Sequence, residues 1–174
     1  MSRRVVVGLD LSLRAAAAAR VTLPWDGDLE DVITRVVGQD LSAGSEPEAY
    51  ARRLDLIATA IADFCEGADA VYVEEYAFSS MSKRAHSLGE VGGVVKLELF
   101  RRSGRSPTPV TASTARKTML QKLPRAGVKP FTMRNVRRLG PPANKWTEDQ
   151  IDAFVTMNHG VMLEGGVALT FLGE

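Results

Sequence analysis

Four carboxylate side chains stand in segments that are otherwise apolar. Asp10 interrupts the run VVVGLDL, and Glu74 directly follows the apolar run VYV. Asp149 and Asp152 lie three residues apart in EDQIDAFV, a spacing that places both side chains on one face of a helix. A carboxylate is costly to bury without a partner, so these acids need cations that offset their charge.

Grouped carboxylates with open coordination positions are the oxygen ligands that suit Mg²⁺ or Mn²⁺. Two such ions about 3.5–4 Å apart serve phosphodiester cleavage. Asp10 and Asp152 are therefore candidate metal ligands. Asp149 is a third, although the helix dipole alone also favours an acid in a first helical turn. Glu74 or Glu75 completes the set, because neighbours in a strand face opposite sides and only one can share a site with Asp10.

Charge is distributed unevenly along the chain, although the net charge is only +1. Residues 79–145 carry 15 Lys or Arg against 2 Asp or Glu, a net charge of +13. Residues 1–78 and 146–174 are acidic, at −7 and −5. This asymmetry indicates a face that binds a polyanion beside carboxylates with another use. Together with the acids, it predicts a metal-dependent site for a nucleic-acid substrate.

The sequence lacks the motifs that several other kinds of active site require. The chain contains no P-loop, GxGxxG, HExxH or GxSxG motif, which speaks against nucleotide binding, zinc hydrolysis and a serine nucleophile. His159 stands two helical turns after Asp152, so a supporting role beside the carboxylates and simple packing in the core both stay open. The lone Cys65 is expected to be a small buried hydrophobe on a helix.

The cysteine count and the hydrophobic runs predict a soluble cytoplasmic protein. A single cysteine cannot form an intramolecular disulfide, which fits a reducing compartment. No apolar run approaches the ~18 residues that a membrane helix needs.

The elements that must position these residues follow from changes in hydrophobic period. Period-two runs predict five strands, at 5–13, 15–23, 31–39, 70–76 and 107–111. Period-3.6 runs predict helices at 47–65, 83–102, 114–122 and 130–139, and a last helix that begins after a capping box at Thr147. We expect one α/β domain over residues 1–174, with a five-stranded mixed sheet flanked by helices. The first three strands form an antiparallel meander, and a crossover places the fourth parallel.

Four blocks of sequence carry a family resemblance: GLDLS at 8–12, VEEYAF at 73–78, LGEVGG at 88–93 and DQIDAF at 149–154. In order and spacing they resemble the RuvC-type Holliday junction resolvases of the ribonuclease H-like superfamily, and phage-borne members would look similar. The resemblance implies a ribonuclease H-like fold and metal-dependent, structure-specific cleavage of four-way or other branched DNA junctions. It also implies homodimers that nick symmetric strands, with the helix at 83–102 at the two-fold interface.

The resemblance further implies roles for individual residues. Asp10, Glu74, Asp149 and Asp152 match the four acids that bind two Mg²⁺ ions, for which Mn²⁺ substitutes. Lys117 falls near the family's basic catalytic residue, and Arg116 is an equally good candidate. DNA contacts are implied for basic residues and for two aromatics where the family places a wedge in the junction: Lys83, Arg84, Arg116, Lys122, Lys129, Arg134, Tyr76 and Phe78.

Three other functions stay open at this stage. A ribonuclease H-like nuclease acting on RNA–DNA hybrids fits the same acids and the same basic segment. A junction-binding recombination accessory without cleavage would need the basic residues but not the four acids. An actin-like or sugar-kinase-like ATPase is the third, because GLDLS also suits a phosphate-binding turn. A motor or packaging partner is not specified by the sequence.

Overall fold

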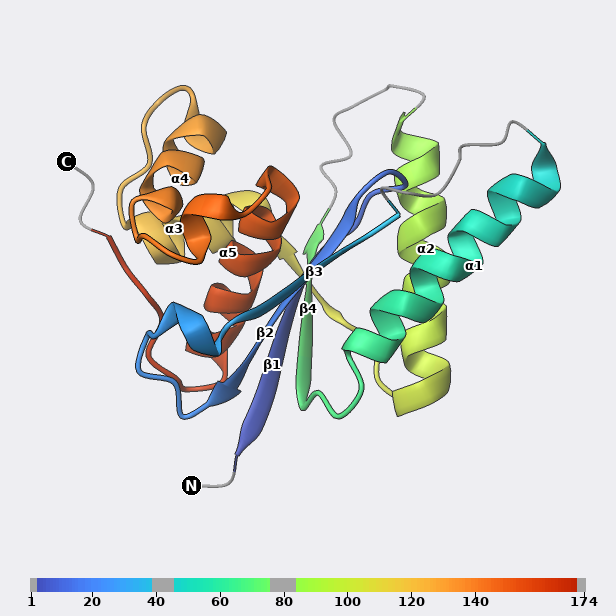
Figure 1. The fold of residues 1–174 in the computed structure, drawn as a ribbon, viewed down its shortest axis with the longest axis horizontal. Helices are drawn as coiled ribbons and strands as arrows, with labels where there is room; N and C mark the ends of the chain where they lie inside the picture. The colour runs from blue at the N-terminus through green and yellow to red at the C-terminus, as the bar shows by residue number, and fades with distance from the viewer. Residues whose placement is uncertain (1–2, 39–45, 76–83, 172–174) are drawn as a thin grey trace.

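The computed structural model describes residues 3–38, 46–75 and 84–171 (Figure 1). At its centre is a five-stranded mixed sheet with strand order β3-β2-β1-β4-β5. The antiparallel pairs are β1–β2 and β2–β3, and the parallel pairs are β1–β4 and β4–β5. The strands are β1 (Arg4–Asp10), β2 (Ala16–Leu23), β3 (Ile33–Val37), β4 (Ala70–Glu75) and β5 (Thr108–Thr111). The predicted meander and parallel crossover are confirmed.

Helices cover both faces of the sheet (Figure 1). One face is covered by α1 (Pro47–Phe64) and α2 (Arg84–Ser103), which pack on each other. The other is covered by α5 (Glu148–Leu163), on which α3 (Ala112–Leu120) and α4 (Val128–Arg137) pack. Within the described ranges, no helix is long and apolar enough to cross a membrane.

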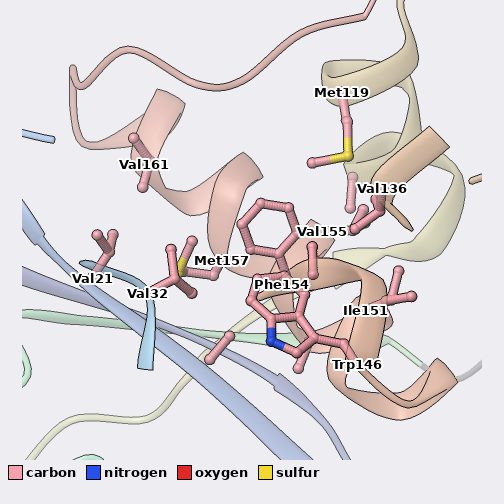
Figure 2. Packing of buried hydrophobic residues seen from close by; sticks show 14 of the residues in the cluster. Val21, Val32, Met119, Val136, Trp146, Ile151, Phe154, Val155, Met157 and Val161 are labelled. Carbon is pink, nitrogen blue, oxygen red and sulfur yellow. The ribbon is translucent and has the colours of Figure 1, made fainter. Parts of the chain in front are cut away.

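Strand alternation assigns successive residues to different cores. In β1, Val6 belongs to the core under α5, whereas Val7 and Leu9 belong to the core under α1 and α2. The core under α5 includes Phe154, whose ring centroid lies 5.0 Å from that of Trp146 (Figure 2). Both faces of β1 are therefore packed along its length until the strand ends at Asp10.

Several boundaries differ from those predicted, and local hydrogen bonds account for some of them. The first strand ends at Asp10 rather than residue 13, and the Ser12 hydroxyl accepts a hydrogen bond from the backbone N–H of Ala15 in the turn that follows. The third strand starts at Ile33 because η1 (Leu29–Asp31), capped by Asp28, precedes it. Cys65 is buried directly after α1, as predicted for a small hydrophobe.

Two glycines allow α5 to pack closely on the sheet. A Cβ atom at Gly8 would lie 2.2 Å from the backbone nitrogen of Met157 and 2.4 Å from the carbonyl oxygen of Ala153. A Cβ atom at Gly160 would lie 2.3 Å from the ring of Tyr72. A side chain at Gly8 would require α5 to move, and one at Gly160 would require the buried Tyr72 ring or the helix to move, so these glycines allow α5 to sit close to β1 and β4.

Candidate active site

Asp10 and Glu74 reach the same edge and the same face of the sheet. Asp10 is the last residue of β1, and Glu74 is the last but one of β4, which pairs in parallel with β1. Glu74 has the same strand parity as Tyr72, which packs in the core under α5, whereas Glu75 has the parity of Val73 in the opposite core. Strand alternation therefore brings Glu74, and not Glu75, to the face that carries Asp10.

The two acids of α5 come to this edge from the helix N-terminus. The capping box between Thr147 and Gln150 starts the helix, and the Gln150 Nε2 also donates to Thr34 Oγ1 over 2.8 Å, which ties the helix start to β3. Asp149 is half-buried, and Asp152 is buried at 3% exposure. The spacing of three residues gives both acids one helix face, as expected.

Two basic side chains hold the carboxylate of Asp152. The Arg116 Nη2, from α3, donates to Asp152 Oδ1 over 2.9 Å. The Lys129 Nζ, from the first turn of α4, lies 2.8 Å from Asp152 Oδ2 and 3.7 Å from Glu148 Oε2. Each oxygen of this buried carboxylate therefore has its own cation, which offsets the cost of burying its charge.

The carboxylates are electrostatically coupled, and their ionised forms are disfavoured. Burial raises the pKa of Asp10 to about 8, and repulsion from Glu74 and from the two α5 carboxylates adds to the rise, while Lys129 opposes it. Burial also raises the pKa of Glu74; Asp152 adds to that rise, and Arg116 and Lys129 oppose it. The basic side chains therefore offset only part of the negative charge at this edge.

The donor set fits a hard divalent cation in chemistry and in charge. All four acids offer carboxylate oxygens, and among the described residues Asp10 and Glu74 make no hydrogen bond or ion pair of their own. As the side chains stand, no three His, Cys, Asp or Glu residues in the described parts of the chain are close enough together to hold a metal ion. Both oxygens of the Asp152 carboxylate are instead paired with side-chain cations, Oδ1 with Arg116 and Oδ2 with Lys129.

The other predicted site residues separate into those near the carboxylates and those away from them. Arg116 reaches Asp152, whereas its neighbour Lys117 is exposed on α3. Lys129 lies inside α4 and not ahead of it, because that helix begins at Val128. Lys122 and Arg134 are exposed. The remaining predictions fall on Tyr76, Phe78 and Lys83, outside the described residues, and on Arg84, of which only the backbone in α2 is described.

Two contacts at or near the site could not be read from sequence. Glu148 lies beside Lys129, a pairing that depends on how α4 docks against the start of α5. The Nδ1 of His159 lies 2.6 Å from Thr118 Oγ1, and burial lowers the pKa of this histidine. His159 is seven positions after Asp152 in α5, about 10 Å along the helix axis, so the histidine packs against α3 and does not contact that carboxylate.

A groove with basic walls adjoins the carboxylates. It has a volume of about 550 Å³ and runs along α4 to the start of α5. Its lining includes Lys129, Arg134, Arg137 and Arg138, with Met133 and Pro130 as apolar neighbours. The side chain that holds Asp152 thus also lines the groove.

Comparison with known proteins gives a match in structure but none in sequence. No family model and no curated protein matches the chain. A structure described as Thermus thermophilus RuvC in complex with Holliday junction substrate aligns with a TM-score of 0.71 and 19% identity, over 97% of this chain and 99% of that one. A second Thermus thermophilus RuvC structure aligns with a TM-score of 0.65 and 20% identity, over 92% and 96% of the two chains. The chain therefore has the RuvC-type, ribonuclease H-like fold that its four sequence blocks predicted.

Proposed function

We propose that this protein is a metal-dependent, structure-specific DNA endonuclease that hydrolyses phosphodiester bonds at four-way or other branched junctions. Residues 1–174 would act as one nuclease domain. The observation that carries the proposal is the convergence of Asp10, Glu74, Asp149 and Asp152 at one edge of the sheet, beside a basic groove. The fold adds support, because a protein with the same fold was solved with a Holliday junction substrate.

The chain's own residues have distinct parts in this proposal. The four acids would hold Mg²⁺ or Mn²⁺. Two such ions would activate a water molecule and stabilise the leaving 3′ oxygen. Arg116 fixes the orientation of the Asp152 carboxylate from the α3 side. The basic side chains of α4 would hold the phosphate backbone, which positions DNA without reading its sequence.

The exposed face of α2 supports the homodimer that this function needs. Gly89 and Gly93 are exposed with no atom within 4 Å of an added Cβ, and Leu97 and Phe100 follow on the same face at 48% and 55% exposure. Gly92, by contrast, is buried and does not share this face. Two copies that meet through this small-and-apolar face would present two sites for paired nicks on symmetric strands.

Cleavage of defined substrates in Mg²⁺ tests the proposal. We expect a labelled four-way junction to be cut in preference to a linear duplex, and Asp10→Asn to abolish cutting while Asp55→Asn, an exposed acid on α1, leaves it unchanged. Preference for an RNA–DNA hybrid would instead identify a ribonuclease H-like enzyme. Junction binding without nicking in any divalent metal would identify an accessory protein.

A further inference from the structure

Lys129 connects two regions that the proposed function uses separately. Its ammonium group lies 2.8 Å from Asp152 Oδ2, and its side chain also lines the α4 groove. The two side chains differ in exposure and so in their room to move: the Lys129 side chain is 45% exposed, whereas the Asp152 side chain is 4% exposed. Lys129 can therefore turn toward a ligand in the groove, while Asp152 stays where α5 holds it.

The groove is built to receive a polyanion. The guanidinium groups of Arg134, Arg137 and Arg138 make no ion pair or hydrogen bond with other described residues, and all three are exposed. The first turn of α4 contains no acid, and Glu148, the acid in the groove lining, lies 3.7 Å from Lys129. A phosphate backbone in this groove would meet these three guanidinium groups and the Lys129 ammonium.

We propose that Lys129 is a cation shared between Asp152 and a DNA phosphate, so that DNA in the α4 groove and a divalent cation at the carboxylates bind cooperatively. The inference rests on the proposed function. A divalent cation must displace Lys129 from Asp152, and a phosphate draws Lys129 away from the same oxygen. Because this ion pair has to be broken only once when both ligands bind, each ligand strengthens the binding of the other.

Arg116 does not share this role. Its side chain is 14% exposed against 45% for Lys129, and its contact is with the other oxygen, Asp152 Oδ1. Its Nε is buried without a partner in the described structure, so the guanidinium is enclosed between α3 and α5. Arg116 is therefore expected to stay on Asp152 as the positioning residue while Lys129 exchanges.

Binding of Mn²⁺ to the DNA-free protein, measured from the electron paramagnetic resonance signal of free Mn²⁺, tests the first half of the proposal. Lys129→Met should bind Mn²⁺ about 3- to 10-fold more tightly than wild type, because no ion pair has to be broken. Lys129→Arg should bind like wild type. Lys145→Met, which removes an exposed charge just ahead of α5, is the matched control and should also bind like wild type.

Junction affinity with and without Ca²⁺ tests the second half. Fluorescence anisotropy at constant ionic strength gives the ratio of dissociation constants in EDTA and in Ca²⁺, and by reciprocity this ratio reports the same coupling. We expect Ca²⁺ to tighten binding about 3- to 10-fold in wild type, Lys129→Arg and Lys145→Met. In Lys129→Met the ratio should fall to about one.

The outcomes separate this inference from the proposed function. If Mn²⁺ binding is lost in Asp10→Asn but Lys129→Met changes neither the Mn²⁺ affinity nor the Ca²⁺ ratio, the shared cation is wrong and the metal-dependent nuclease stands. If wild type binds no Mn²⁺, both fail. Thermal unfolding of each variant identifies any loss of fold. If Lys129→Met is unstable, Lys129→Gln, which also removes the positive charge, replaces it with the same expected results.

Discussion

The two faces of the sheet are built from the same strands but differ at the carboxyl ends of β1 and β4. On the side of α1 and α2, Leu9 and Val73 are buried among aliphatic side chains. On the side of α5, the next residue of each strand is an acid, Asp10 or Glu74. A strand can thus keep a stable core on one face while it presents carboxylates on the other, because its side chains alternate.

This difference has an energetic side. At the carboxyl ends of β1 and β4, the side facing α1 and α2 gains free energy from burial of Leu9 and Val73. The side facing α5 holds carboxylates whose ionised forms are disfavoured there, with the pKa of Asp10 raised to about 8. Substitutions on the two faces should therefore distinguish a loss of cleavage activity from a loss of folding stability. The predictions that follow use neighbouring or matched residues for that purpose.

The sharpest contrast is between two adjacent glutamates. Glu74→Gln should reduce single-turnover junction cleavage by about 100-fold or more while junction binding is retained, because a metal-binding carboxylate is lost. Glu75→Gln, on the opposite face, should cleave at nearly the wild-type rate. Loss of cleavage in Glu75→Gln instead would show that the acids of β4 are assigned to the wrong faces.

A second contrast concerns the packing of α5 against β1. Gly8→Ala should lower the free energy of unfolding by about 3 kcal/mol, because the new methyl group would overlap the backbone of Met157 and Ala153. Chemical denaturation measures the change. Gly93→Ala, on the open face of α2, should instead raise stability by up to about 1 kcal/mol when measured at a protein concentration low enough for monomers. Equal stability of the two variants would contradict the close approach of α5.

The exposed residues of the α1 and α2 layer test the dimer. Phe100→Glu should weaken self-association about tenfold or more, because it places a charge in the proposed apolar contact between α2 helices. Leu56→Glu, at a similarly exposed position on α1, should leave association unchanged. Sedimentation velocity over a range of concentrations measures both. A wild-type protein that is monomeric throughout would rule out paired sites in a dimer.

The smallest expected effect is on stability as pH changes. Because the pKa of Asp10 is higher in the folded protein than in the unfolded chain, its contribution to metal-free stability is greatest at low pH and is lost as pH rises from about 4 to about 8. Asp10→Asn should therefore be more stable than wild type by about 1 kcal/mol or more at pH 8, and by less at pH 4. Thermal melts in EDTA check this, and a variant that is less stable at pH 8 would contradict it.

Local sequence patterns predicted those features of the site that are set within a single strand or helix. The parity of Asp10 in β1, the spacing of Asp149 and Asp152, and the capping box at Thr147 all follow from residues close in sequence. The ribonuclease H-like sheet followed from the order of these elements and from the four sequence blocks. These features are set by backbone periodicity, which a sequence displays directly.

Contacts between elements were harder to predict. Arg116 and Lys117 are neighbours in α3, and only the packing of α3 on α5 determines that Arg116 reaches Asp152. The ion pairs of Lys129 depend in the same way on where α4 docks. Sequence reasoning gave Lys117 the catalytic role with Arg116 as an equal alternative; in the structure, Arg116 is the one of the two that contacts Asp152.

The most direct test of the central proposal is to map the cleavage products of a synthetic four-way junction, with each strand labelled in turn, in Mg²⁺. We predict paired nicks at symmetric positions in two opposing strands, and no nicks with Asp10→Asn. An intact junction, equal cutting of a linear duplex, or full cutting by Asp10→Asn would contradict the proposal that these four acids form a junction-resolving nuclease site.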